Sequence, residues 1–204
     1  MRHRSVTYTR LLSHGTRTGL ILATIAFATL FVGCKQRYVP KPYGYCRIDL
    51  PEHTYRQVQP TDVPIVFDIS TSASIVQHDD PTWFDIKYPT LNAVIYCNYK
   101  PVNHNLRQLS DDAQEFVFKH SGKASSIPEQ GFADEQNKVY GVYYELRGNT
   151  ASPQQFYLTD STRHFFRGSV YFNCIPNQDS LAPVVNFLDD DLRHLIESVR
   201  WTAD

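Results

Sequence analysis

The spacing of hydrophobic residues changes along this chain in an ordered series, and this series limits the fold more than any other feature. Short runs rich in β-branched and aromatic residues, which favour strands, stand before and after one segment with helical spacing. A second helical segment follows near the end. We expect the first two strand runs to form a hairpin, because Ser and Thr residues between them favour a turn. The expected strands are residues 64–69, 73–77, 82–88, 91–99, 124–127, 138–146, 154–158 and 164–172.

Two segments repeat their apolar residues at helical spacing. The first has Asn103 as a candidate N-cap and Gly122 as a candidate stop, and the second has Asp179 or Ser180 as its candidate N-cap. The apolar face of the first comprises Leu106, Leu109, Ala113, Phe116, Val117 and His120. That of the second comprises Leu181, Val184, Val185, Leu188, Leu192, Leu195, Ile196 and Val199.

The order of these elements predicts an α+β fold, in which helices pack on an antiparallel sheet. We expect a curved antiparallel sheet with an internal and a C-terminal helix. In element order this arrangement resembles the PsbP-like sandwich. The length after residue 51 suits one domain with its own core, so we assign residues 52–204 to a single α+β domain.

Residues 1–33 have the features of a secretory signal peptide that ends at a lipid-attachment cysteine. Arginines at positions 2, 4, 10 and 17 precede an apolar run over residues 19–33. As a helix this run would reach only ~22 Å, short of the about 30 Å of a bilayer core. Residues 30–34 resemble a bacterial lipobox, although Phe31 stands where leucine is commonest. We predict cleavage between Gly33 and Cys34 and acylation of Cys34. The alternatives are a transmembrane anchor, or an ordinary signal peptide with an incidental cysteine.

Residues 34–51 are predicted to be an acylated cysteine followed by a Pro- and Tyr-rich stalk. Pro40 and Pro42 favour an extended path away from the membrane. The stalk tyrosines could dock onto the domain or meet a partner. The tyrosines that could form a partner-binding patch are Tyr38, Tyr43, Tyr45, Tyr143 and Tyr144.

Charge and cysteine usage exclude some classes of function. The part after residue 33 keeps all 21 acidic residues but loses four of the 20 Lys and Arg, which leaves a formal net charge of −5. This balance argues against binding nucleic acid or an anionic lipid surface. With Cys34 acylated, Cys46, Cys97 and Cys174 are left. Cys97 and Cys174 could form a disulfide, or all three could be small buried hydrophobes. No Cys/His spacing predicts a metal site.

The sequence carries no catalytic signature, so we predict neither an enzyme nor a cofactor site. Asp160, Ser161 and His164 are the residue types of a hydrolytic Ser-His-Asp triad and lie close together in the sequence. They are crowded into one expected turn, whereas the members of a catalytic triad usually converge from separate elements. We therefore assign them a turn role.

Several stretches resemble the gliding-motility lipoprotein family GldD. They are PKPYGYCRIDLP at residues 40–51, and residues 139–149, 155–168, 171–183 and 191–197. Cys46 is a departure, because an aromatic residue is expected there. The resemblance implies an envelope lipoprotein of Bacteroidota that is needed for gliding and is associated with the type IX secretion machinery. It implies no known catalysis and supplies no active-site residues.

Two hypotheses follow. The first is a non-enzymatic accessory or assembly factor, held in the membrane by its lipid and docking gliding or secretion components. We expect it on the periplasmic face of the outer membrane, because residues 35–38 lack the acidic run that often routes lipoproteins of Bacteroidota outward. The second is a binding or hydrolytic module that acts on peptidoglycan or lipid, which would need a concave site with converging polar groups.

Overall fold

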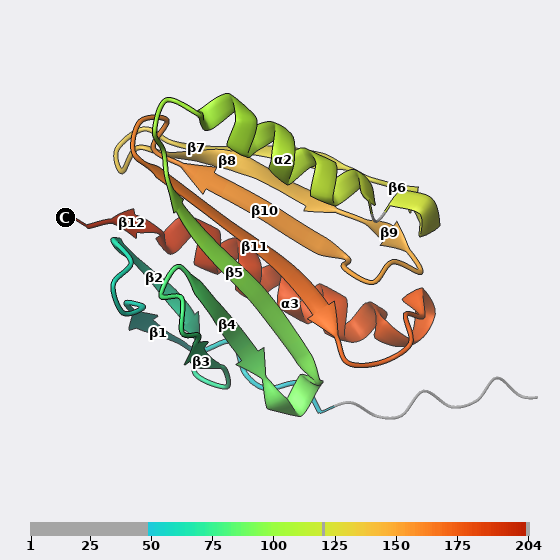
Figure 1. Ribbon diagram of the computed structural model, residues 1–204. Coiled ribbons are helices and arrows are strands. Elements are labelled where there is room, and N and C mark those ends of the chain that lie inside the picture. Colours follow the sequence, from blue (N-terminus) through green and yellow to red (C-terminus); the bar gives the residue numbers. More distant parts are fainter. Residues whose placement is uncertain (1–48, 120, 203–204) are drawn as a thin grey trace, which may run out of the picture. The chain divides into compact units, whose positions relative to one another are not determined.

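A computed structural model describes residues 49–119 and 121–202 (Figure 1). The predicted signal peptide, Cys34, Cys46 and the three stalk tyrosines lie outside the described residues. Within them, no helix combines the length and the apolar character needed to cross a membrane.

A seven-stranded antiparallel sheet forms the centre of the described part, in the order β3-β4-β5-β11-β10-β8-β7. Its central pair, β5 and β11, is in register from Ala93↔Phe172 to Pro101↔His164. The strands are β3 (Ser74–Gln77), β4 (Trp83–Tyr88), β5 (Ala93–Pro101), β7 (Glu129–Asp134), β8 (Val139–Glu145), β10 (Gln154–Thr159) and β11 (His164–Phe172).

Two smaller sheets accompany it. One has the order β1-β2-β12, with β1 at Tyr55–Val58, β2 at Ile65–Ser70 and β12 at Arg200–Trp201. The other pairs β6 (Ala124–Ser126) with β9 (Arg147–Gly148). Short 3-10 helices occupy Pro89–Leu91 and Ser121–Lys123.

The predicted hairpin of residues 64–69 and 73–77 is wrong. β2 pairs with β1 and β12, whereas β3 pairs with β4 at the edge of the large sheet. The reason is burial: Ile65, Phe67 and Ile69 of β2 are all buried in the main core with residues of α3. β3 has no fully buried residue. The turn after Ser70 therefore carries the chain from one sheet to another.

The two helices cover opposite faces of the large sheet (Figure 1). α3 (Gln178–Ser198) packs in the main core, which also contains Phe156 and Leu158 of β10. α2 (Leu106–Lys119) packs beside Tyr157, which lies between those two residues and so points to the other face. This arrangement confirms the predicted α+β class, with one internal and one C-terminal helix on an antiparallel sheet.

The helix ends differ from those predicted. Asn177 caps α3, its side-chain oxygen accepting a 3.1 Å hydrogen bond from the backbone N–H of Ser180. Asp179 and Ser180 therefore lie inside the first turn. α2 begins at Leu106, directly after Asn105, so Asn103 is too early to cap it, and Gly122 lies in the 3-10 helix beyond its end.

Candidate functional site

Asp160, Ser161 and His164 do not form a catalytic triad. Asp160 Oδ1 accepts the backbone N–H groups of residues 162, 163 and 164 at 2.7–2.9 Å, and Oδ2 accepts the Thr162 hydroxyl. Ser161 has a φ of 68°, in the left-handed region. The His164 side chain is buried, its Nδ1 2.8 Å from the Tyr99 hydroxyl and its ring stacked on Trp201. These contacts build a turn, as predicted.

The predicted partner-binding role of Tyr143 and Tyr144 is wrong, because both side chains are buried. Tyr143 donates a hydrogen bond to Asp189 of α3, and Arg193 lies over its ring. Tyr144 packs in a small cluster with Val117 of α2 and Leu146. The sequence of β8 alone could not show that both tyrosines are buried. Their burial comes from helices that cover the two opposite faces of the strand.

Cys97 and Cys174 are not paired: Cys97 is a buried free thiol and Cys174 an exposed one. Burial, with a smaller contribution from the charge of Asp85, raises the pKa of Cys97 well above its usual value. A buried thiol of raised pKa is a small hydrophobe with little nucleophilic character. The described residues hold no group of His, Cys, Asp and Glu suited to a metal ion.

A buried carboxylate on α3 was not foreseen from the sequence. Asp191 Oδ1 lies 2.7 Å from His53 Nδ1 and accepts the Tyr55 hydroxyl at 3.1 Å. The Tyr55 ring stacks on His194, 3.7 Å away between centroids. Burial, and then the charge of Asp191, raises the pKa of Tyr55 to about 12, so its hydroxyl keeps its proton. This cluster fastens the start of the described chain to α3.

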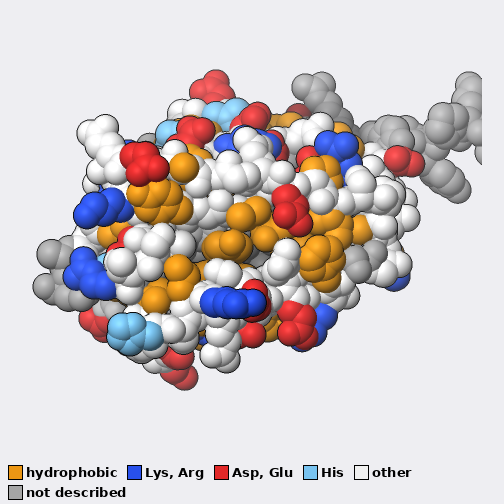
Figure 2. Space-filling view, turned by 90° about the horizontal axis from the view of Figure 1, so that it is seen from above, with side chains coloured by type: hydrophobic (Ala, Val, Ile, Leu, Met, Phe, Trp, Pro, Cys, Tyr) orange, Lys and Arg blue, Asp and Glu red, His pale blue; other side chains and the backbone are white. Residues whose placement is uncertain are grey.

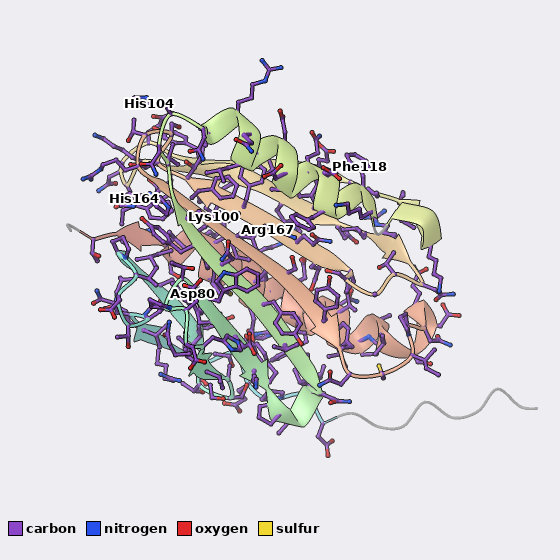
Figure 3. All side chains as sticks on the ribbon, viewed as in Figure 1. Asp80, Lys100, His104, Phe118, His164 and Arg167 are labelled. Carbon is purple, nitrogen blue, oxygen red and sulfur yellow. The ribbon has the colours of Figure 1, made fainter. Side chains whose placement is uncertain are left out.

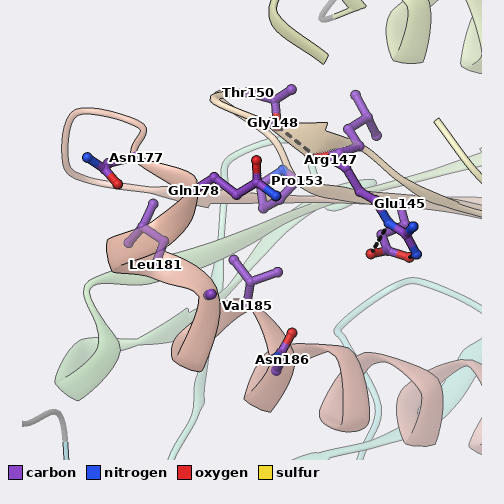
Figure 4. A pocket seen from close by; sticks show the side chains of 12 residues that line it. Glu145, Arg147, Gly148, Thr150, Pro153, Asn177, Gln178, Leu181, Val185 and Asn186 are labelled. Carbon is purple, nitrogen blue, oxygen red and sulfur yellow. Dashed lines mark hydrogen bonds and ion pairs between the residues drawn. The ribbon is translucent and has the colours of Figure 1, made fainter. Parts of the chain in front are cut away.

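One surface hollow, the α3 cavity, lies where α3 begins beside the end of β8 and β9 (Figure 4). Its volume is ≈ 190 Å³. An ion pair between Arg147 and Glu145, 3.0 Å long, lies at one side. The α3 cavity is lined by Glu145, Leu146, Arg147, Gly148, Thr150, Pro153, Asn177, Gln178, Leu181, Ala182, Val185 and Asn186.

A second and larger hollow, here called the aromatic groove, lies on the α2 side of the large sheet. Its volume is ≈ 390 Å³. Trp83, Tyr96 and Phe116 are 54%, 47% and 42% exposed, which is unusual for such large apolar side chains. The groove is lined by Trp83, Tyr96, Cys97, Asn98, Lys100, Phe116, Arg167, Ser169 and Tyr171.

Strand register brings the groove together. Trp83 of β4 is opposite Asn98 of β5, which is opposite Arg167 of β11, so these three form one row across the sheet. Tyr96 and Ser169 are opposite each other in the next row. α2 packs on β10 and β11 and leaves β4 and β5 uncovered on this face (Figure 1). Lys100 of β5 lies on the uncovered part, and Arg167 of β11 lies beside α2 (Figure 3).

Arg167 is the central charged group of the groove. Its guanidinium carbon lies 4.2 Å from the centroid of the Phe116 ring, and one nitrogen is 3.4 Å from the Ser169 hydroxyl. Burial lowers the pKa of Arg167. Among the described residues no carboxylate forms an ion pair with it, and none lines the groove.

The face seen from the top of Figure 1 carries charges of both signs (Figure 2). Seen from the top of Figure 1, where α2, β7 and β8 lie, acidic and basic side chains are interspersed with small apolar areas (Figure 2). This face therefore carries no extended field of one sign. The aromatic groove differs because its lining is aromatic and cationic.

The described residues thus form an α+β domain that carries the α3 cavity and the aromatic groove on its surface, and the Asp160, Ser161 and His164 trio belongs to a turn rather than to a catalytic site. A family model described as gliding motility lipoprotein GldD matches residues 35–201. The chain belongs to this family, which confirms the resemblance found in the sequence and implies a membrane-anchored place in the cell envelope.

Among solved structures, the chain is similar to cyanobacterial PsbP (CyanoP) from Synechocystis sp. PCC 6803, with a TM-score of 0.44 and 10% sequence identity. The match covers 79% of this chain and 99% of that one. The search of curated proteins finds no match.

Proposed function

We propose that this gliding-motility lipoprotein is a non-enzymatic accessory or assembly factor for gliding motility and type IX secretion. It would be attached through acylated Cys34 to the periplasmic face of the outer membrane. The observation that carries the proposal is the family match over residues 35–201. The turn role of Asp160 and the burial of His164 support the non-enzymatic part, because they remove the one candidate trio that the sequence offered.

Protein–protein contact is the mode of action that the surface favours. Trp, Tyr and Arg are the residues that most often dominate binding energy at protein interfaces. The aromatic groove presents all three on one open half of a sheet, with Trp83 the most exposed of its aromatic side chains. An assembly factor needs such a surface, whereas an enzyme needs converged reacting groups.

The test is recovery of partners from cells. The tagged full-length chain is crosslinked mildly in a gliding host and purified, and its partners are identified by mass spectrometry. We expect gliding or type IX secretion subunits to be enriched over a control lipoprotein that carries the same tag. Repeated recovery of none of these subunits would contradict the proposal.

A second candidate function is binding of an envelope ligand such as a peptidoglycan or lipid fragment. The α3 cavity favours it, because amide and charged side chains converge there. Its ≈ 190 Å³ is below the roughly 300 Å³ at which ligand pockets usually begin. A muropeptide that raised the melting temperature of the chain, but not that of an Arg147→Ala variant, would favour this second function.

A further inference from the structure

We infer that the aromatic groove binds an acidic segment of a partner polypeptide. A carboxylate of that segment would pair with Arg167, and an adjacent apolar side chain would stack against Trp83 and Tyr96. This inference rests on the proposed function and deepens it, since it names the chemistry by which a partner is recognised.

The charge of the groove selects an anion. Arg167 and Lys100 line it, and no acidic side chain of residues 49–119 or 121–202 does. The acid that follows Trp83 on the same face of β4 is Asp85, which is already 2.9 Å from His78 Nε2 and 3.8 Å from Lys87 Nζ. The guanidinium is planar and offers paired donors that fit a carboxylate. Because Arg167 is partly buried, an ion pair formed there is screened less than one on the open surface.

Contacts within the groove fix the position of the Arg167 guanidinium. Phe116 stacks against one side of Arg167, and the Ser169 hydroxyl lies beside it. A side chain that is already held in place loses less conformational freedom on binding. The partner therefore meets a pre-positioned cation rather than a mobile surface arginine.

The aromatic side chains at the sides of the groove favour a polypeptide as its ligand. Trp83 and Tyr96 expose about half of their surface, and burying aromatic side chains of this size supplies much of the energy of protein interfaces. Asn98 and Ser169 add hydrogen-bonding groups along the floor. A partner strand that carries an acidic residue next to an apolar one could satisfy the cation, the polar floor and the aromatic walls together.

The test uses two blocked dipeptides, N-acetyl-Asp-Phe-amide and N-acetyl-Asn-Phe-amide, with the purified full chain in detergent. Binding is measured by ligand-observed NMR. We expect the aspartyl peptide to bind about tenfold more tightly, the effect of one charge-assisted hydrogen bond. The Arg167→Gln variant should lose this preference, and Trp83→Ala should weaken both peptides.

Phe118→Ala is the matched control, because Phe118 is 46% exposed on α2 but does not line the groove. It should leave both affinities unchanged. Equal affinity for the two dipeptides, or no binding of either, would overturn the inference. Tighter binding of N-acetylmuramic acid than of the aspartyl peptide would also overturn it, by assigning the groove to a glycan.

A second arm separates this inference from the proposed function. Full-length chains with Trp83→Ala and Arg167→Gln together should lose the crosslinked subunits that the unaltered chain recovers. If the double variant recovers them equally, the groove inference fails while the assembly role stands. If the unaltered chain recovers none but still prefers the aspartyl peptide, the assembly role fails while the chemistry of the groove stands.

Discussion

At the scale of single residues, Asp160 shows how a candidate catalytic acid becomes a structural one. Burial by itself would raise its pKa, but three backbone N–H groups and the Thr162 hydroxyl outweigh this and lower the pKa to about 2. The ionised carboxylate therefore holds the turn between β10 and β11. An acid fixed in this way is unsuited to proton transfer near neutral pH.

Replacing Asp160 with alanine should lower the free energy of unfolding by about 1–2 kcal/mol at pH 7, after allowance for solvent screening. Because the folded pKa of about 2 is below the usual 3.8, this stabilisation is present above the unfolded pKa and is lost as the pH falls through about 2. Urea denaturation at pH 7, 4 and 2.5 measures the difference.

Asp79→Ala, which alters an exposed acid in another turn, serves as the control and should show little effect at any of these pH values. A difference between the unaltered chain and Asp160→Ala that stays constant across the series would show that the carboxylate charge does not hold the turn.

At the scale of elements, close approach between strands explains one glycine in β8. A Cβ atom on Gly141 would lie 2.0 Å from the carbonyl oxygen of Tyr157 in β10. That contact involves backbone, which cannot move without breaking the pairing of Gly141 with Leu158. Gly131 in the edge strand β7 has nothing within 4 Å of the same position.

Gly141→Ala should therefore lower the free energy of unfolding by about 2 kcal/mol or more, because the overpacked strand must shift. Gly131→Ala should change it by less than about 0.5 kcal/mol. Chemical denaturation of the two variants under identical conditions measures both. Equal stability of the two variants would mean that β8 and β10 tolerate a wider separation than the structure has.

At the scale of the whole molecule, the predicted lipid anchor at Cys34 would decide where the groove can act. The family match begins at residue 35, directly after the predicted attachment cysteine. One acyl chain gives only reversible membrane binding, and each buried methylene contributes ~0.8 kcal/mol, so stable attachment takes at least two chains. A Cys34 that carries two or more acyl chains would therefore keep the domain stably at the membrane.

Labelling cells with a palmitate analogue should mark the unaltered chain and leave a Cys34→Ser variant unmarked. The variant should also lose its membrane attachment, whereas the unaltered chain should stay with the membranes after osmotic shock. An unaltered chain that carried no label and was released by the shock would contradict lipidation at Cys34.

The sequence by itself determined the features that depend on residues close to one another along the chain. Helical spacing from Leu106 onward and from Leu181 onward indicated both helices, and β-branched and aromatic runs indicated most of the large sheet. The polar strands β1 and β7 gave no such signal, because they are mostly exposed and are held by pairing with β2 and β8. Asp160 was assigned correctly because a turn is local.

Only the tertiary structure decided which sheet β2 joins, that Tyr143 and Tyr144 are buried, and that the aromatic groove exists. Trp83 and Asn98 belong to the consecutive strands β4 and β5, but Arg167 belongs to β11, much later in the chain, and register places all three in one row. Periodicity tells which residues share a face of one strand, but not which strand lies beside it or which half of the face a helix leaves open. Those choices depend on burying the most apolar surface over the whole chain, which no local pattern contains.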